Sequence, residues 1–325
     1  MDITLITPAA PRSRAGNRAT ATRWANLLRA LGHRVTIATS DAGAAAVRRP
    51  ADAVIALHAW RSAEAIAAAA DHAPNRPLVV ALTGTDIYRF QHTDPEVTLV
   101  GMAHAHALIG LHDGVADDIP ARFRDRVHTV HQSAHPLPPS YPGPPRNRFR
   151  VLVAGHLRAE KDPLRAPLAA RELPPASRLA VVHLGRAHDA AWADAARAEA
   201  AANPRFTWYG EVSHGRVRRF LAASHVMVVS SIMEGGANVV SEACVAGLPV
   251  IASSIPGNRG LLGDDHPAIY PAEDTAALRD LLVRAESDPA FLAELRERSH
   301  ARAPLFTPAR ERLDLARALA AAGVS

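Results

Sequence analysis

The chain reads SSIMEGGANVVSEACVAGLPVIAS from residue 230 to residue 253. A β-like run leads into this stretch, and Glu234 stands at its end, before two glycines. Glycines let a backbone pass close to a ligand, and the N–H groups and dipole of a following helix favour a phosphate. The stretch therefore predicts an anion cradle, with backbone contacts from Gly235, Gly236, Ala237 and Asn238.

Two carboxylates frame the cradle. Glu242 follows Glu234 by eight residues, which is about two helical turns. One carboxylate can therefore address hydroxyl groups at the helix start while the other reaches a second polyol. This geometry suits a nucleotide-sugar. The alternative is a surface helix with two solvated carboxylates.

The Glu-x7-Glu spacing, continued by EACVAGLPV, resembles family 4 of the retaining GT-B glycosyltransferases. The resemblance implies an α/β fold of two Rossmann-like, doubly wound domains facing a central cleft. It also implies a UDP-sugar donor and transfer with retention. By the same resemblance, Glu234 contacts the transferred sugar and Glu242 binds the ribose.

A second segment, VAGHLRAEKD over residues 153–162, resembles the family's G-R-L-x-x-x-K-G, in which a basic pair clamps the diphosphate. Lys161 matches this pattern, whereas His156 stands where the arginine is usual, so we expect Arg158 to reach the same phosphates. The chain has no D-x-D motif, and cations and a helix dipole must then stabilise the leaving UDP. Catalytic roles are predicted for Lys161, Arg158 and Glu234, and no metal is expected. The alternative is a pair of solvated loop charges.

Three further segments carry weaker signals. Glu211 and Val212, in WYGEVS over residues 208–213, resemble the segment that reads uracil, although an ordinary strand end is an equal alternative. The loop PRSRAGNR over residues 11–18 follows the first strand, at the edge where open α/β sheets bind ligands. The resemblance implies donor contacts from Gly16 and Asn17. The loop's arginines suit an anionic acceptor or are solvated, namely Arg12, Arg14 and Arg18.

The segment TGTD over residues 83–86 resembles the family's acceptor-side H-G-x-D, with Thr83 in place of the histidine. We expect Thr85 and Asp86 on the acceptor side. A helix-capping role for Asp86 is an equal alternative.

Elsewhere β-like runs alternate with helical stretches, the pattern of a parallel α/β sheet. The expected strands are 3–7, 34–38, 53–57, 78–82, 107–111, 150–154, 179–184, 206–209, 226–230 and 249–252, and the expected helices include 20–31, 97–106, 192–202, 215–223 and 308–321. A proline-dense segment over residues 136–145 interrupts the alternation. We therefore predict an acceptor-side domain over 1–145 and a UDP-sugar domain over 146–305. By resemblance, a final helix within 306–325 packs back on the first domain.

Composition narrows the functional class. The single cysteine excludes an intramolecular disulfide, and no stretch approaches the roughly 20 apolar residues of a membrane span. The formal charge of +5 comes from dispersed arginines, a pattern that does not favour nucleic acid. Histidine spacings define no metal site. We expect a cytoplasmic protein with small-molecule substrates and without nucleic-acid or membrane partners.

A narrower resemblance concerns the segments PRSRAGNR, TGTDIY and MEGGANVVSE, which are similar to those of selenosugar-forming members of the family. This resemblance implies UDP-N-acetylglucosamine or a close UDP-hexose as the donor and selenophosphate as the acceptor. The alternatives are a family 4 transferase with a sugar, lipid-linked or small-molecule acceptor and a non-catalytic UDP-sugar binding protein.

Overall fold

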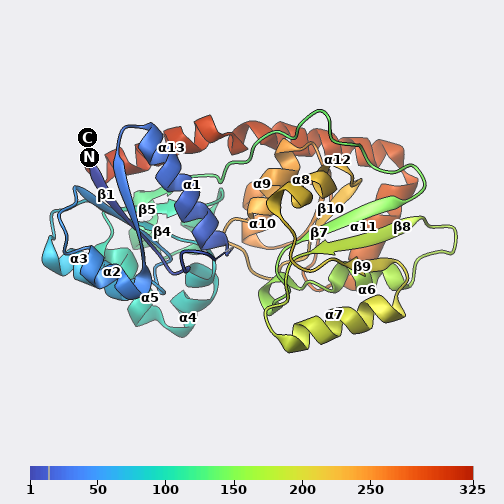
Figure 1. The fold of residues 1–325 in the computed structure, drawn as a ribbon, viewed down its shortest axis with the longest axis horizontal. Helices are drawn as coiled ribbons and strands as arrows, with labels where there is room; N and C mark the ends of the chain where they lie inside the picture. The colour runs from blue at the N-terminus through green and yellow to red at the C-terminus, as the bar shows by residue number, and fades with distance from the viewer. Residues whose placement is uncertain (14, 325) are drawn as a thin grey trace. The chain divides into compact units, whose positions relative to one another are not determined.

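The computed structural model describes residues 1–13 and 15–324. It divides into two compact units. Unit 1 contains residues 1–133, 234–236 and 308–325, and unit 2 contains residues 134–233 and 237–307. Two Rossmann-like α/β units confirm the predicted fold class (Figure 1).

Unit 1 is built on a six-stranded parallel sheet in the order β2-β1-β3-β4-β5-β6. Its central strands are short apolar runs buried on both sides, as parallel sheets covered by helices require. The strands are β1 (Asp2–Thr7), β2 (Arg34–Thr39), β3 (Ala53–Leu57), β4 (Leu78–Ala81), β5 (Ala107–Gly110) and β6 (Val127–Thr129).

Helices cover both faces of this sheet. One core gathers apolar side chains of α1 and α13, which lie side by side in Figure 1. The opposite core includes residues of α3 and α5. The helices are α1 (Gly16–Ala30), α2 (Ser40–Ala46), α3 (Ala63–His72), α4 (Gln91–Thr93), α5 (Pro95–His104) and α13 (Pro308–Ala321), with a π-helical turn, η1 (Asp86–Phe90), before α4.

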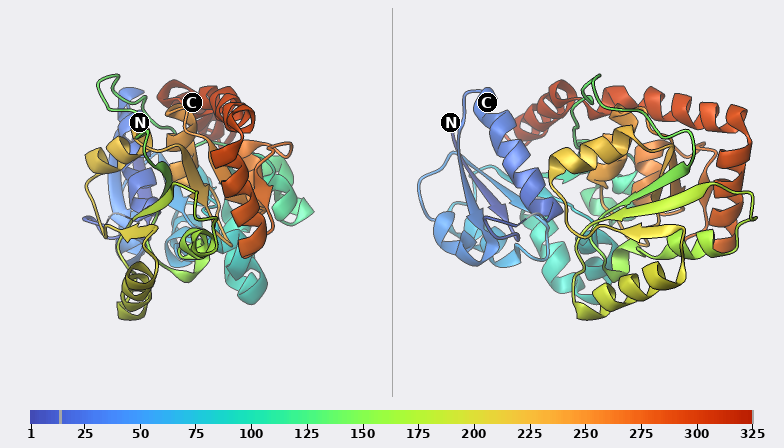
Figure 2. Two further views of the ribbon diagram at one scale, coloured as in Figure 1. Left: turned by 90° about the vertical axis from the view of Figure 1, so that its right-hand side faces the viewer. Right: turned by 45° about the vertical axis from the view of Figure 1, so that its right-hand side comes forward.

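Unit 2 repeats the architecture with a parallel sheet in the order β12-β11-β10-β7-β8-β9. Figure 2 shows its strands between helices on both sides. The strands are β7 (Phe149–Ala154), β8 (Leu179–Leu184), β9 (Phe206–Trp208), β10 (Val226–Val229), β11 (Val250–Ser253) and β12 (Ile269–Tyr270).

Four helices of unit 2 begin at side chains that accept a backbone N–H, namely Asp189, Ser213, Asp274 and Asp288. Helices α8, α9 and α10 contribute to one core and α6, α11 and α12 to the other. The bounds are α6 (Arg165–Arg171), α7 (Ala190–Ala202), α8 (His214–Ala222), α9 (Asn238–Val245), α10 (Pro256–Leu262), α11 (Thr275–Ser287) and α12 (Pro289–Arg302), with short 3-10 turns that include η4 (Ala159–Lys161).

The predicted boundary at residue 145 moves to residue 133. Ala134 N donates to Phe306 O at 2.9 Å. Arg218 donates to the carbonyl oxygens of His135 and Pro136. These bonds attach the proline-rich segment to unit 2. Within the described chain, no helix combines the length and apolar character that crossing a membrane requires.

Candidate active site

The loops that follow β7 and β8 are joined at the carboxyl edge of the unit 2 sheet. Leu157 N donates to Arg186 O, and His188 N donates to Leu157 O, both at 2.9 Å. Gly185, at φ +148°, lies so close that an added Cβ would overlap the carbonyl oxygen of Gly155. Glycine is therefore required where the two loops meet.

Replacing Gly185 with alanine should lower the free energy of unfolding by about 2–4 kcal/mol, because the new methyl group displaces backbone and the φ angle disfavours it. Gly143 is the matched control, since an added Cβ there would meet nothing within 4 Å and its φ is not positive. Urea denaturation measures both variants. Equal midpoints for the two variants would contradict the packing argument.

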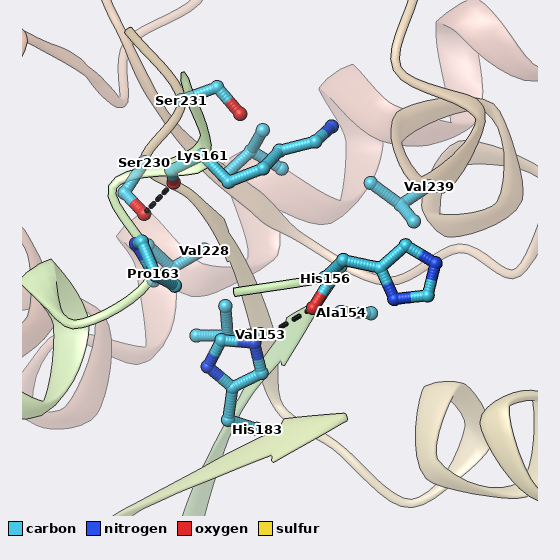
Figure 3. A pocket seen from close by; sticks show the side chains of 12 residues that line it. Val153, Ala154, His156, Lys161, Pro163, His183, Val228, Ser230, Ser231 and Val239 are labelled. Carbon is cyan, nitrogen blue, oxygen red and sulfur yellow. Dashed lines mark hydrogen bonds between the residues drawn. The ribbon is translucent and has the colours of Figure 1, made fainter. Parts of the chain in front are cut away.

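A pocket opens between these loops and the end of β10. Lys161, His156, Ser230 and Ser231 line it together with backbone of Gly155. Figure 3 shows the side chains of Lys161 and His156 reaching across it. The hydroxyl of Ser230 donates to the carbonyl oxygen of Asp162 at 2.7 Å, which fixes the backbone next to Lys161.

Positive charge converges on this pocket. The pKa of His156 lies below its ordinary value because of burial and then because of the nearby cations Arg186, Arg158 and Lys161; Glu211 acts in the opposite direction. Nδ1 of His156 is buried and finds no hydrogen-bond partner among the described residues. Lys161 therefore lines the pocket beside a neutral imidazole, and Arg158 and Arg186 are near enough to His156 to act on it electrostatically. This arrangement suits an anionic ligand with several oxygen acceptors.

Arg186 is a residue that the sequence motifs did not indicate. Its signal is its position, because it follows Gly185 directly after a buried strand, at the ligand-binding edge of an open sheet. The side chain of Arg158 is more exposed than that of Lys161. Its guanidinium is nearly half exposed and lies 4.0 Å from a carboxylate oxygen of Glu160.

Helix α9 carries the second predicted carboxylate. Its N-cap residue is Ala237, whose side chain cannot accept a hydrogen bond from the helix. Glu242, one turn into the helix, lies 3.5 Å from Nε2 of His214 at the start of α8. Hydrogen bonding to Glu242 raises the pKa of His214 above its ordinary value. A ligand hydroxyl that binds Glu242 would share the carboxylate with this histidine.

The strand β9 leads into the predicted uracil segment. Tyr209 N donates to His183 O, and Gly185 N donates to Gly210 O, so this loop joins the same sheet edge. Glu211 is exposed, whereas Val212 packs against the adjacent core.

The segment Glu234–Gly236 packs within unit 1. A Cβ on Gly235 would overlap backbone of Thr83 and Gly84, and one on Gly236 would lie 2.5 Å from Cβ of Leu111. The small size of both glycines is therefore required for packing. The structure thereby brings the predicted sugar-contact segment together with the turn that carries the acceptor-side motif.

Asp86 shapes that turn from inside. Its side chain is fully buried and accepts hydrogen bonds from the backbone N–H groups of Thr83, Gly84 and Ala59. The carboxylate therefore has no exposed surface for an acceptor; it binds backbone of the turn itself, and it is not a helix N-cap, because that position is Thr85. Oγ1 of Thr83 is buried without a hydrogen-bond partner among the described residues.

Thr85 has an oriented hydroxyl. Nδ1 of His58 accepts from Arg61 N, so the proton of this buried imidazole resides on Nε2. Nε2 lies 2.8 Å from Oγ1 of Thr85 and donates to it. Burial lowers the pKa of His58, which keeps the ring neutral. The hydroxyl proton of Thr85 is then available to a ligand.

The loop after β1 holds the remaining predicted residues. Gly16 and Asn17 begin α1, and an added Cβ on Gly16 would meet open space. Arg12 is exposed and Arg18 half-buried, and neither forms an ion pair with a described residue. Arg14 lies outside the described residues. Within the described ranges, no three histidine, cysteine, aspartate or glutamate residues are grouped to hold a metal ion.

Several solved structures are similar to this chain over nearly its whole length. HepE from Anabaena in complex with UDP and glucose has 15% identity and a TM-score of 0.78, covering 98% of this chain and 99% of that one. Sucrose-phosphate synthase from Thermosynechococcus elongatus has 18% identity and a TM-score of 0.79, with 97% of both chains covered. A glycosyltransferase from Rickettsia africae has 14% identity and a TM-score of 0.75, covering 98% of this chain and 97% of that one.

These likenesses show a shared GT-B fold. No curated protein sequence matches the chain. The profile of the family "Glycosyl transferases group 1" matches residues 141–304, just over half of the chain. The chain therefore belongs to the glycosyl transferases group 1 family.

Proposed function

We propose that this protein is a selenosugar synthase: a metal-independent, retaining glycosyltransferase that moves N-acetylglucosamine from UDP to selenophosphate. The observation that carries the transferase activity is Lys161 in the pocket beside the β7, β8 and β10 strand ends, with Arg158 and Arg186 near His156 of the same pocket. A departing diphosphate needs such charge where no metal assists. The acceptor rests on the resemblance of residues 11–18, 83–88 and 233–242 to selenosugar-forming enzymes.

The donor side is assigned residue by residue. Lys161, Arg158 and Arg186 hold the diphosphate, with the N-terminus of α9 as a further positive end. Glu242 binds the ribose, and Glu234 contacts the transferred sugar. The other donor contacts are assigned to Gly16, Asn17, Glu211, Val212, Gly235, Gly236, Ala237 and Asn238.

The acceptor side is assigned to Thr85 and to the loop arginines Arg12, Arg14 and Arg18. Selenophosphate is a small anion, so cations near the reacting carbon would position it. As a strong nucleophile it needs little help from a general base. Two features agree with an acceptor that needs no general base. Thr83 stands where the family has a histidine, and the hydroxyl of Thr85 is oriented toward donating a hydrogen bond.

In the proposed reaction, selenium attacks C1 of the sugar from the face that UDP leaves. The bond between C1 and the β-phosphate oxygen breaks, and UDP departs with the bonding electron pair. Water then cleaves the selenium–phosphorus bond and releases phosphate. The product is a sugar with selenium on C1 in the configuration of the donor.

The test uses the purified chain with UDP-N-acetylglucosamine, UDP-glucose and UDP-galactose, each with and without freshly prepared selenophosphate and with and without EDTA. UDP release and product mass are measured. We expect UDP only with selenophosphate, an EDTA-insensitive rate, and a product with the isotope pattern of selenium. A parallel assay replaces selenophosphate with sugar acceptors, and calorimetry measures UDP-sugar binding. UDP release with sugar acceptors but not with selenophosphate would refute the acceptor, and failure to bind any UDP-sugar would refute the transferase.

A further inference from the structure

A buried side chain of unit 1 binds the segment Glu234–Gly236. Gln132, 3% exposed and a few residues beyond β6, donates from Nε2 to the carbonyl oxygen of Gly236 at 2.7 Å. Leu111 also packs against this glycine. The carbonyl is therefore fixed by a hydrogen bond as well as by packing.

The amide of Gln132 has a fixed orientation. Its Oε1 lies 2.7 Å from Nη2 of Arg23 and 2.7 Å from Oγ1 of Thr20. Because a guanidinium only donates, the atom that faces Arg23 must be the oxygen. The NH₂ group is then directed to Gly236, and a flipped amide would place two donors against each other.

A buried carboxylate holds Arg23 in turn. Nε of Arg23 lies 2.9 Å from both carboxylate oxygens of Glu311 on α13. The fully buried Glu311 also accepts from Nε1 of Trp24 at 2.8 Å and from the backbone and hydroxyl of Ser133. Buried networks with their partners in place are rigid, because each lost partner leaves a desolvated polar group.

We infer that Gln132 is a positioning residue for the donor sugar: through Gly236 it holds Glu234 in place, braced by α1 and α13. The inference rests on the proposed sugar contact of Glu234. Its physical basis is that transition-state contacts need a backbone that is set before the substrate arrives. The diphosphate and ribose of UDP are assigned mainly to side chains of unit 2, such as Lys161 and Glu242, so the affinity for UDP should depend little on Gln132.

The decisive variant is Gln132→Glu. A carboxylate keeps the acceptor for Arg23 and Thr20 but cannot donate to Gly236; because Arg23 already pairs with Glu311, the second variant also controls for the added charge. Gln132→Asn, one methylene shorter, is the second variant in case the first fails to fold. The matched control is Thr20→Val, which removes a hydrogen bond to the same amide oxygen and leaves the Gly236 contact intact.

Three quantities are measured: the dissociation constants of UDP and UDP-N-acetylglucosamine by calorimetry, kcat for UDP release, and hydrogen exchange of the amides of residues 235–239. For Gln132→Glu we expect a kcat lower by about 10–100-fold, as for loss of a hydrogen bond to a preorganised group. The dissociation constant of UDP should stay within about twofold, and exchange at 235–239 should rise. Thr20→Val should keep kcat within about threefold.

Wild-type kcat and exchange in Gln132→Glu would overturn the inference, and so would equal losses of kcat and UDP affinity in all variants. A wild-type chain that binds no UDP-sugar defeats the proposed function instead. In that case the exchange measurement still decides whether Gln132 holds the segment.

Discussion

Replacing Lys161 with alanine is expected to lower kcat for UDP release by about 10²–10³-fold, the usual loss when one preorganised electrostatic group is removed from a transition state. The side chain lines the pocket at the end of η4, beside His156 and the arginines that converge there. Charge develops on the leaving diphosphate as the sugar–oxygen bond breaks, and a cation at this place stabilises it. The dissociation constant of UDP should rise less than kcat falls.

Lys161→Arg is the matched control. It keeps the charge but replaces a compact ammonium with a larger planar group, so we expect an intermediate kcat. Arg205→Ala is a second control, because Arg205 donates to the carbonyl oxygens of Ser177, before β8, and Leu179, the first residue of β8. If Lys161→Ala turns over like Arg205→Ala, the diphosphate lies elsewhere and the assignment of the pocket is wrong.

The composition of the chain allows Lys161 to be modified selectively. Lys161 is the single lysine among 325 residues. Reductive methylation therefore modifies this side chain and the N-terminal amine alone, and peptide mass spectrometry separates the two. We expect bound UDP to protect Lys161 and to leave the N-terminus reactive. Equal protection of both amines, or of neither, would contradict binding of UDP at the pocket.

Much of the fold was predictable from local patterns. Buried parallel strands have short apolar runs between turn signals, and runs such as 53–57, 179–184 and 226–229 are strands in the structure. Less regular elements were missed, including α2, α6, α10, β6 and β12. These helices are seven residues long and the strands two or three. Their formation depends on packing that no local periodicity reports.

The site was predictable only where a residue type and a strand end coincide. Lys161 and Glu242 follow from motif and position, and the structure places both beside the ends of unit 2 strands or on the helix that follows one. The network of Gln132, Arg23 and Glu311 was not predictable, because it joins residues separated by 109 and 288 positions in sequence. The role of Asp86 differs from expectation for a similar reason. Burial by the tertiary fold, rather than local sequence, decides whether a carboxylate meets ligand or backbone.

The protein should lose stability steeply as the pH falls below about 6.5, the ordinary pKa of histidine. Burial lowers the pKa of six described histidines, and the effect is large at His183, whose pKa falls to about 4. The full set is His58, His112, His156, His183, His225 and His266. Between the folded and unfolded pKa values the unfolded chain binds more protons than the folded chain. The free energy of unfolding therefore decreases as the pH decreases through that window. His214, whose pKa is raised, acts in the opposite direction but is a single exposed group.

His183→Gln isolates the contribution of this ring. His183 is 1% exposed, and its Nε2 lies 3.0 Å from the carbonyl oxygen of Gly155. Nδ1 is buried without a partner in the described chain.

Keeping this ring neutral lowers the free energy of unfolding at pH 5 by about 2 kcal/mol relative to pH 7, because each pH unit below 6.5 contributes about 1.4 kcal/mol. Urea denaturation measures the free energy of unfolding at pH 7 and at pH 5. The loss between the two pH values should be smaller by that amount in His183→Gln than in the wild type. The exposed His188 is the matched control, since its side chain is solvated in both states. An unchanged difference in His183→Gln would mean that the ring takes up its proton in the folded protein, and that the sheet edge between β7 and β8 opens to water in acid.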